Sequence, residues 1–373
     1  MFNTLHKCLA VSAVSAALFV SAAQAATPAT PYSGLVIFGD SISDTGNVLS
    51  LTKAFTNFPF PSFPDAEGRF SDGKVWTEYL AEGLGLANAA KPANLFFTGA
   101  PGPGGVITIG ALLGSNFAYG GARTGISGSA GPTTGLLGQL TNWNGQTFGT
   151  SLARAADPNA LYVVVAGAND LRDARSSFAT DSAADTAARS TAASAVAWNV
   201  VNSVSLLANA GARHFLISNL PDLGKTPEAI FLGLSAESTD ITLKFNSALL
   251  ANADAFDSFF QSRTGVDLDI RTLDFYGLNE MVAANPAFYD ISNLTSPCIT
   301  TGPSGQYFAP GAVGNNCSES AFSDPLHPSS RAHQLLGQLA ITTAVPEPSS
   351  IAMMAMGILV IGGIVRRRRV SAA

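Results

Sequence analysis

A serine near the start of the chain and an acid–histidine pair near its end are the residues best suited to chemistry. Ser41 follows an apolar run, residues 35–38, in a turn rich in Gly, Asp, Ser and Asn. Asp324 and His327 stand three residues apart in a segment that holds two prolines, a spacing that lets a carboxylate orient an imidazole. Serine is a good nucleophile only beside a base. Each pattern by itself also fits an ordinary turn.

Other sources of chemistry are weaker. His214 begins an apolar strand and His333 lies inside a terminal helix, so both are interpreted as structural. Dispersed histidines without cysteine pairs at ligand spacing do not predict a metal site. No Gly-x-Ser-x-Gly elbow occurs in the chain, which argues against an ordinary α/β-hydrolase. The Gly-rich residues 98–138 lack the Gly-Lys-Ser/Thr of a phosphate loop, and no carboxylate pair stands out for glycoside hydrolysis.

The elements that must position these residues alternate between strands and helices. Apolar runs predict strands at residues 35–38, 161–165, 214–218 and 267–275. Helical spacing or propensity predicts helices at residues 74–81, 182–209, 239–260 and 330–342. Residues 50–73, rich in Phe and Pro, predict a long loop without regular helix. This order predicts one α/β domain with a parallel sheet covered by helices on both faces, and Ser41 would lie at the strand ends where such sheets bind ligands.

Both ends of the chain carry targeting signals. Lys7, an apolar stretch at residues 9–23 and the sequence Ala-Gln-Ala predict a signal peptide, residues 1–25, that is cleaved after Ala25. Residues 345–373 hold Val-Pro-Glu-Pro, an apolar run at 351–365 and four arginines. That run would form about 22 Å of helix, short for a hydrocarbon core of about 30 Å, with the arginines on the cytoplasmic side. For this segment, a plain C-terminal membrane anchor is the alternative to a targeting signal. The body, residues 26–344, would be exported.

Charge and cysteine content limit the function further. Without both ends the chain keeps 15 basic and 25 acidic residues, a net charge of −10, which makes nucleic acid a poor partner. Cys8 would leave with the signal peptide, so Cys298 and Cys317 remain. In an exported chain two cysteines are expected to form a disulfide, which would stabilise the fold by about 3 kcal/mol for a loop of this length. A free catalytic thiol is the rival, and the even count argues against it.

Five short blocks, in this order along the chain, resemble the signature blocks of the GDSL, or SGNH, hydrolases. They are residues 38–47, 69–73, 116–122, 167–170 and 324–328. Ile42 stands where leucine gives the family its name. The resemblance spans residues 34–340, and the Phe-Pro-rich insertion is similar to that of secreted esterases, phospholipases and autotransporter lipases. It implies a three-layer α/β/α sandwich with a central parallel sheet, flavodoxin-like in type.

The resemblance also implies a role for each site residue. Ser41 would be the nucleophile, His327 its general base and Asp324 the acid that orients the imidazole. The oxyanion hole would consist of the Ser41 N–H, the Gly121 N–H and the Asn169 amide. Gly120 is adjacent, and the offset from Asn116 favours Gly121. No metal or cofactor is implied. Asp40, Asp44 and Asn47 are interpreted as residues that stabilise the turn.

The resemblance leaves the substrate open among lipids, short acyl esters and acetylated sugars. The tail resembles PEP-CTERM sorting signals of exopolysaccharide-producing Gram-negative bacteria. It implies transient anchoring in the inner membrane, cleavage by an exosortase, and a secreted, cell-surface or matrix location. A secreted serine esterase or lipase is the leading hypothesis. The alternatives are a polysaccharide O-acetylesterase and a noncatalytic surface or matrix protein that retains the fold.

Overall fold

The computed structural model of the chain describes residues 31–56, 59–61, 65, 67–93, 97–98, 108–109, 114–144, 154–301 and 314–345. The predicted signal peptide and nearly all of the predicted sorting tail, including its apolar run, lie outside these residues.

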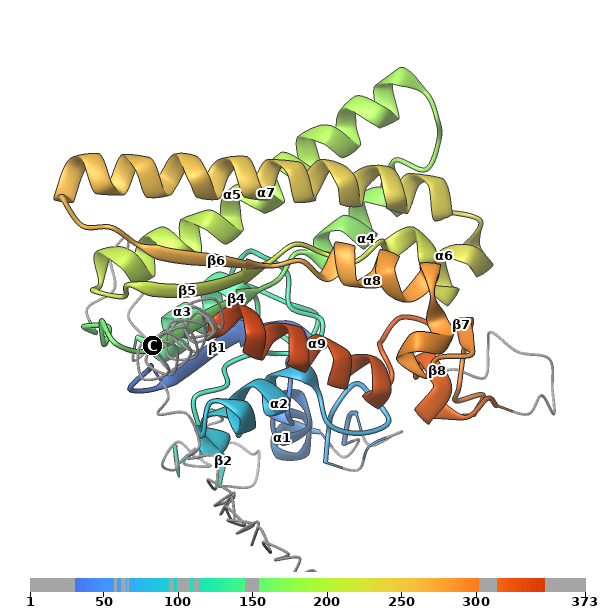
Figure 1. Cartoon of the computed structure of the whole chain (residues 1–373), viewed down its shortest axis with the longest axis horizontal. Helices are drawn as coiled ribbons and strands as arrows, with labels where there is room; N and C mark the ends of the chain where they lie inside the picture. Colours follow the sequence, from blue (N-terminus) through green and yellow to red (C-terminus); the bar gives the residue numbers. More distant parts are fainter. Residues whose placement is uncertain are drawn as a thin grey trace, which may run out of the picture.

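A four-stranded parallel sheet forms the centre of the fold (Figure 1). Its strands stand in the order β1 (Leu35–Gly39), β4 (Leu161–Val165), β5 (His214–Ser218) and β6 (Asp269–Leu273). β4 is buried at every residue, as expected for a strand covered on both faces. Residues 115–119 run along the other edge of β1, where the Ile37 N–H donates to the Ser115 carbonyl at 2.9 Å and the Ile37 carbonyl accepts the Phe117 N–H at 2.7 Å.

Helices cover both faces of this sheet. Because side chains alternate along a strand, Phe38, Tyr162 and Phe215 pack with one set of helices. That set consists of α3 (Leu136–Trp143), α4 (Ala168–Ser177), α5 (Ala183–Asn209) and α7 (Ser235–Thr264). Ile37, Val163 and Leu216 pack on the other face, which α2 (Trp76–Gly83) and α9 (Ser330–Ala344) cover. The predicted three-layer α/β/α arrangement is therefore confirmed.

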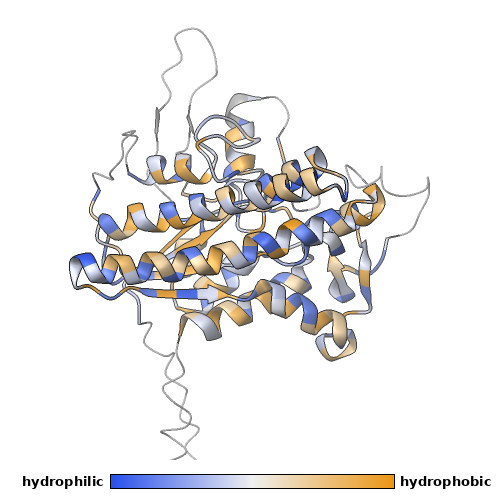
Figure 2. Cartoon of the chain, turned by 90° about the horizontal axis from the view of Figure 1, so that it is seen from above, coloured by the Kyte–Doolittle hydropathy of each residue, from blue (hydrophilic) through white to orange (hydrophobic). Residues whose placement is uncertain are grey.

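The helix α5 is half buried core structure although it is long and apolar. Among the described residues it is the one helix long and apolar enough to cross a membrane, and half of that apolar stretch is buried. Seen from above, the two long helices α5 and α7 carry hydrophilic and hydrophobic residues mixed along their length (Figure 2). Ser182 caps α5 by accepting the Asp185 N–H at 3.1 Å, and Gly211 follows its end with φ 118°, so α5 covers the helix predicted at residues 182–209.

The prediction of an uninterrupted loop at residues 50–73 is wrong at its start. Helix α1 (Asn47–Phe55) occupies residues 50–55, because the first proline, Pro59, lies beyond the helix and cannot interrupt its hydrogen bonds. β6 is also shorter than predicted: Asp274 accepts the Gly277 N–H at 2.8 Å and starts a helix there. α7 in turn begins four residues earlier than predicted.

Several short elements complete the chain. They are β2 (Phe97–Thr98), β3 (Thr108–Ile109), α6 (Pro227–Leu232), α8 (Phe275–Ala284), β7 (Asn293–Pro297) and β8 (Ser320–Phe322), with short 3-10 turns between some of them. α6, α8, β7 and β8 gather at the end of the molecule toward which the sheet strands run (Figure 1).

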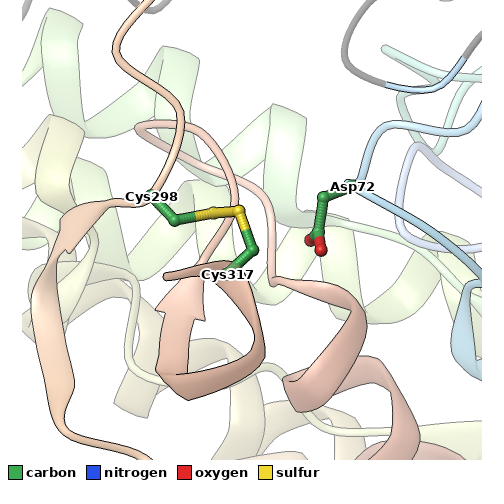
Figure 3. Close-up of side chains that lie close together, drawn as sticks. All are labelled: Asp72, Cys298 and Cys317. Carbon is green, nitrogen blue, oxygen red and sulfur yellow. A yellow bond between two sulfur atoms is a disulfide. The ribbon is translucent and has the colours of Figure 1, made fainter. Parts of the chain in front are cut away.

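The predicted disulfide between Cys298 and Cys317 is present (Figure 3). It joins the residue after β7 to the turn before β8. Asp72 lies beside the two sulfur atoms, and together they are the one cluster of potential metal ligands among the described residues. Sulfur atoms bonded to each other are not thiolate ligands, and the Asp72 carboxylate accepts from Ser330 N and Oγ at 2.7 Å each. Asp72 therefore ties its loop to the start of α9.

Candidate active site

The turn after β1 places Ser41 at the carboxyl edge of the sheet. Gly39 ends the strand, and a Cβ there would lie 2.8 Å from the Val165 carbonyl of β4, so only glycine allows this approach. Asp40 then closes the turn by accepting the Ile42 N–H on its carboxylate at 3.2 Å and the Ser43 N–H on its carbonyl at 3.0 Å. Ser41 is 6% exposed, and it lines a pocket rather than the outer surface.

His327 lies between Ser41 and Asp324. Its Nε2 is 2.8 Å from Ser41 Oγ, and its Nδ1 is 2.6 Å from Asp324 Oδ2. The other carboxylate oxygen of Asp324 accepts the main-chain N–H groups of Leu326 and His327 at 2.8 and 2.7 Å. Burial alone would raise the pKa of Asp324, but the imidazole charge and these hydrogen bonds outweigh it and lower the pKa. An ionised Asp324 fixes the ring with a proton on Nδ1, which leaves Nε2 to accept from the serine.

The segment that carries this pair is held at both ends. Ser323 N–H donates to the His327 carbonyl at 2.9 Å, which closes the turn from the inside. Ser329 then caps α9 by accepting the Ala332 N–H at 3.1 Å. The ring of Phe70 lies 5.3 Å from the imidazole. These contacts hold the imidazole against the serine.

Asn169 and the Gly120–Gly121 turn form the other side of the site. Asn169 opens α4, and its Nδ2 donates to the Ala122 carbonyl at 2.9 Å. Gly120 N–H donates to Asp44 at 2.9 Å, whereas the Gly121 N–H has no acceptor among the described residues. Gly121 has φ 72°, and a Cβ there would lie 2.7 Å from Ser129 Cβ. Of the two glycines that the sequence left as candidates, Gly121 is the one whose N–H is available.

Asp44 joins the serine turn to the glycine turn. Besides the Gly120 N–H, its carboxylate accepts the N–H groups of Gly46, Asn47 and Val48 at 2.8, 2.6 and 3.2 Å. Burial raises the pKa of Asp44 to about 6, against the lowering effect of these four hydrogen bonds. The turn-stabilising role predicted for Asp44 is thus accompanied by a contact with the glycine turn that the sequence did not indicate.

Asn47 and Asp40 also act within the turns. Asn47 Nδ2 donates to the carbonyls of Asn116 and Ala118 at 2.8 and 2.7 Å, so it joins the same two turns. Asp40 is 1% exposed, and its Oδ2 has no hydrogen-bond partner among the described residues. Burial raises the pKa of Asp40 to about 6.

The two other described histidines stay outside the site. His214 begins β5, and its Nδ1 lies 3.1 Å from an Asp269 oxygen. His333 is fully buried in α9, its Nδ1 accepts the Trp76 N–H at 3.2 Å, and burial lowers its pKa to about 3. Neither lines the pocket that holds Ser41.

An apolar pocket with a cavity volume of about 110 Å³ opens beside Ser41, Asn169 and His327. It extends between α8, β8, the start of α9 and the segment that follows β5. Its apolar lining comprises Ile42, Ala168, Leu220, Pro221, Leu223, Phe275, Leu278, Val282, Ile291, Ala321, Phe322, Leu326, Pro328, Ala332, Leu335 and Leu336. A pocket lined in this way is suited to an apolar group.

An ionic network that was not predicted from the sequence lies behind Asn169. Glu228 of α6 pairs with Arg172 and Arg175 of α4, and its main-chain N–H donates to the Pro325 carbonyl at 2.8 Å. The Asn-Asp-Leu-Arg sequence does place an arginine one helical turn after Asn169, a spacing that favours contact. Its acidic partner is 56 residues away in the chain, so no local pattern marks it.

Comparison with known proteins adds two matches to this geometry. The model of the family described as GDSL-like lipase/acylhydrolase matches residues 35–340, and that of the PEP-CTERM protein-sorting motif matches residues 344–369. A GDSL lipase of Tanacetum cinerariifolium is 25% identical over 82% of either chain. Two GDSL esterase/lipases of Arabidopsis thaliana are 28% identical over 90% of this chain and 92% of the relative, and 30% identical over 82% and 89%.

Proposed function

The chain belongs to the GDSL-like lipase/acylhydrolase family and is a carboxylic-ester hydrolase, and from this premise we propose that it cleaves esters through an acyl-enzyme on Ser41. The observation that carries the proposal is the chain of contacts from Ser41 Oγ to His327 Nε2 and from His327 Nδ1 to Asp324. Such contacts join a nucleophile, a base and the acid that orients the base.

The reaction proceeds in two steps. His327 Nε2 accepts the Ser41 hydroxyl proton as Oγ bonds to the ester carbonyl carbon, and the tetrahedral intermediate then expels the alcohol, which takes that proton from His327. Water attacks the acyl-enzyme while His327 accepts a water proton, and collapse of the second intermediate returns the proton to Ser41 and releases the carboxylic acid. Asp324 stays ionised and stabilises the imidazolium in both steps.

The oxyanion of both intermediates is held by the Ser41 N–H, the Gly121 N–H and the Asn169 amide. Both main-chain N–H groups lack an acceptor among the described residues, and the Asn169 amide has a second hydrogen besides the one donated to Ala122. One such donor contributes about 3 kcal/mol to stabilisation of the transition state.

The substrate is an ester whose acyl group is longer than acetyl. The pocket beside Ser41 is lined mainly by apolar side chains, and each methylene that it buries contributes about 0.8 kcal/mol. An acetyl group would leave most of that lining unused, which makes a polysaccharide O-acetylesterase the second candidate. The sorting motif supports that candidate. The tail resembles the sorting signals of bacteria that produce exopolysaccharide, which would supply acetylated sugars as substrate.

The PEP-CTERM motif implies export and a secreted or surface location. We propose in addition that the signal peptide is cleaved after Ala25 and that residues 26–344 form the hydrolase domain. The apolar run at residues 351–365 anchors the precursor in the inner membrane until an exosortase cleaves near Pro346. The domain boundary in this proposal agrees with α9, the last described element, which ends at Ala344 just before the motif's prolines.

Hydrolysis of nitrophenyl acetate and octanoate by the full-length protein tests the mechanism and the acyl preference together. We expect activity that Ser41→Ala and His327→Ala abolish, labelling of Ser41 by a fluorophosphonate, and a preference for octanoate. Unchanged activity of Ser41→Ala, or labelling of another serine, would contradict the mechanism. Release of acetate from acetylated polysaccharide at a higher kcat/KM than octanoate hydrolysis would favour the second candidate. Polysaccharide retention without any labelling would indicate a noncatalytic protein.

A further inference from the structure

The carboxylate of Glu228 lies buried between two arginines of another helix. Glu228 is 8% exposed and stands in the first turn of α6, where Thr226 caps the helix by accepting the Ala229 N–H at 3.2 Å. Arg172 contacts both carboxylate oxygens, with its Nε 2.9 Å from Oε2, and Arg175 Nη2 lies 2.5 Å from Oε2. Burial alone would raise the pKa of Glu228, but the two guanidinium groups outweigh it and lower the pKa. The carboxylate is therefore ionised and fixes α4 against α6.

Arg172 continues this network to Asn169. Its Nη1 lies 3.4 Å from Asn169 Oδ1, a long contact in which a cation still orients an amide dipole. With Oδ1 directed at the cation, Nδ2 is directed at the Ala122 carbonyl, 2.9 Å away. The orientation of the Asn169 amide thus depends on Arg172, and the place of Arg172 depends on Glu228.

The main chain of Glu228 contacts the other half of the site. Its N–H donates to the Pro325 carbonyl at 2.8 Å. Pro325 lies between Asp324 and His327, whose segment closes on itself through the Leu326 and His327 N–H bonds to Asp324. One residue of α6 therefore contacts both the helix that carries Asn169 and the segment that carries the base.

We propose that Glu228 is a positioning residue that sets the Asn169 amide and the His327 imidazole at the spacing the transition state requires. This inference rests on the proposed function, because it takes Asn169 as an oxyanion donor. Donors act on the charge that develops in the transition state, whereas the acyl group is bound by the apolar pocket, which Glu228 does not line. Loss of the network therefore lowers kcat and leaves KM nearly unchanged.

The test compares kcat and KM of the full-length wild type with Glu228→Gln, Arg172→Met and the double variant, using nitrophenyl octanoate. Displacement of catalytic groups by about 1 Å can cost about a hundredfold, so we expect kcat to fall at least about tenfold in each single variant. KM should change by less than about twofold. The double variant should be no slower than the slower single variant, because both remove the same network. Arg172→Lys, which keeps a cation, should recover part of the loss.

A second readout separates positioning from general damage. A trifluoromethyl ketone that adds to Ser41 forms an oxyanion, so its affinity should fall by the same factor as kcat/KM. Glu237→Gln is the matched control, since Glu237 is a carboxylate of similar burial (9% exposed) on α7. It should keep wild-type kcat. Arg172 has a side chain 27% exposed, so Arg172→Met decides the question if Glu228→Gln does not fold.

The outcomes distinguish this inference from the proposed function. If Ser41→Ala keeps wild-type activity, the proposed function fails and the inference fails with it. If Ser41→Ala is inactive while Glu228→Gln and Arg172→Met keep wild-type kcat, the inference alone is overturned. A rise in KM at unchanged kcat, or an equal loss in Glu237→Gln, would also overturn it.

Discussion

Asp44 accepts the main-chain N–H of Gly120 at 2.9 Å, although 76 residues separate them in the chain. The same carboxylate accepts the N–H groups that follow the serine turn. The Asp44 carboxylate therefore fixes the turn that carries Ser41 relative to the turn that carries Gly121. A change at Asp44 should act on catalysis at a distance from every reacting atom.

Asp44→Asn is expected to lower kcat by about tenfold or more, since loss of one oxyanion donor costs about a hundredfold and a displaced donor somewhat less. An amide keeps one acceptor oxygen but turns an NH₂ toward main-chain N–H groups. KM and kcat from initial rates, with the melting temperature, check this. Asp173→Asn, which removes an exposed ion pair with Arg123 on the surface of α4, should behave as wild type. An Asp44→Asn variant with wild-type kcat would show that the glycine turn holds its shape without the carboxylate.

Asp324→Asn should lower kcat by about 10²- to 10⁴-fold at neutral pH with little change in KM. Asparagine presents its NH₂ or its oxygen to Nδ1 without charge, so the imidazolium loses its stabilising partner and the ring its tautomer. Initial-rate kinetics between pH 5 and 9 measure the effect. Recovery of wild-type rates at high pH would mean that Asp324 serves only to set the ionisation of His327.

Val282→Phe should shorten the accepted acyl chain. Val282 lies on α8, lines the pocket and is 7% exposed, so a larger ring fills space that the acyl chain would use. Each methylene excluded from the pocket costs about 0.8 kcal/mol, or about fourfold in kcat/KM, so the exclusion of two methylenes exceeds about tenfold. The ratio of octanoate to acetate hydrolysis should therefore fall at least about tenfold, with acetate hydrolysis unchanged. An equal fall for both esters would place the acyl chain elsewhere.

Asp40 should make the folded protein less stable as the pH rises from about 4 to about 6. Its folded-state pKa is raised from the ordinary 3.8 to about 6, so the folded state binds the proton more tightly and ionisation disfavours folding. Two pKa units correspond to about 3 kcal/mol.

Urea unfolding of wild type and Asp40→Asn between pH 4 and 7 tests this. The variant should gain stability relative to wild type by up to about 3 kcal/mol across the range. The comparison must be a difference between the two proteins, because His333, whose pKa is lowered to about 3, acts in the opposite direction over part of this range. A difference independent of pH would show that Asp40 is not buried as an anion.

Removal of the Cys298–Cys317 disulfide should lower the free energy of unfolding by about 3 kcal/mol, because the bond closes a short loop in the unfolded chain. The activity should fall as well, since Cys298 N–H donates to the Phe322 carbonyl, and Ile299 N–H to that of Ser323, at 3.0 Å each beside the Asp324 segment. Denaturant unfolding of Cys298→Ser/Cys317→Ser, and of the wild type with and without reductant, measures the stability, and initial rates of nitrophenyl octanoate hydrolysis measure the activity. A variant as stable as the wild type would show that closing this loop in the unfolded chain does not stabilise the fold.

The sequence by itself determined the α/β class, the positions of the four parallel strands and the candidate residues Ser41, Asp324 and His327. These features are local: a buried parallel strand such as β4 reads as a continuous apolar run, and Asp324 reaches His327 across three residues. The five ordered blocks added Asn169 and Gly121 by resemblance. The sequence did not predict helix α1, because its last residues were grouped with the proline-rich segment that follows them.

Only the tertiary structure showed which glycine N–H lacks an acceptor among the described residues, which side chains line the pocket and which contacts surround Asn169. The resemblance favoured Gly121 over the adjacent Gly120 only by its offset from Asn116, whereas in the structure Asp44, far away in the chain, accepts the N–H of Gly120. The apolar pocket is assembled from segments between Asp40 and Leu336, and no single segment shows it. Glu228 reaches Arg172 and Pro325 through contacts between elements that are distant in sequence. Such contacts arise when the helices pack on the sheet, so no local pattern of residues encodes them.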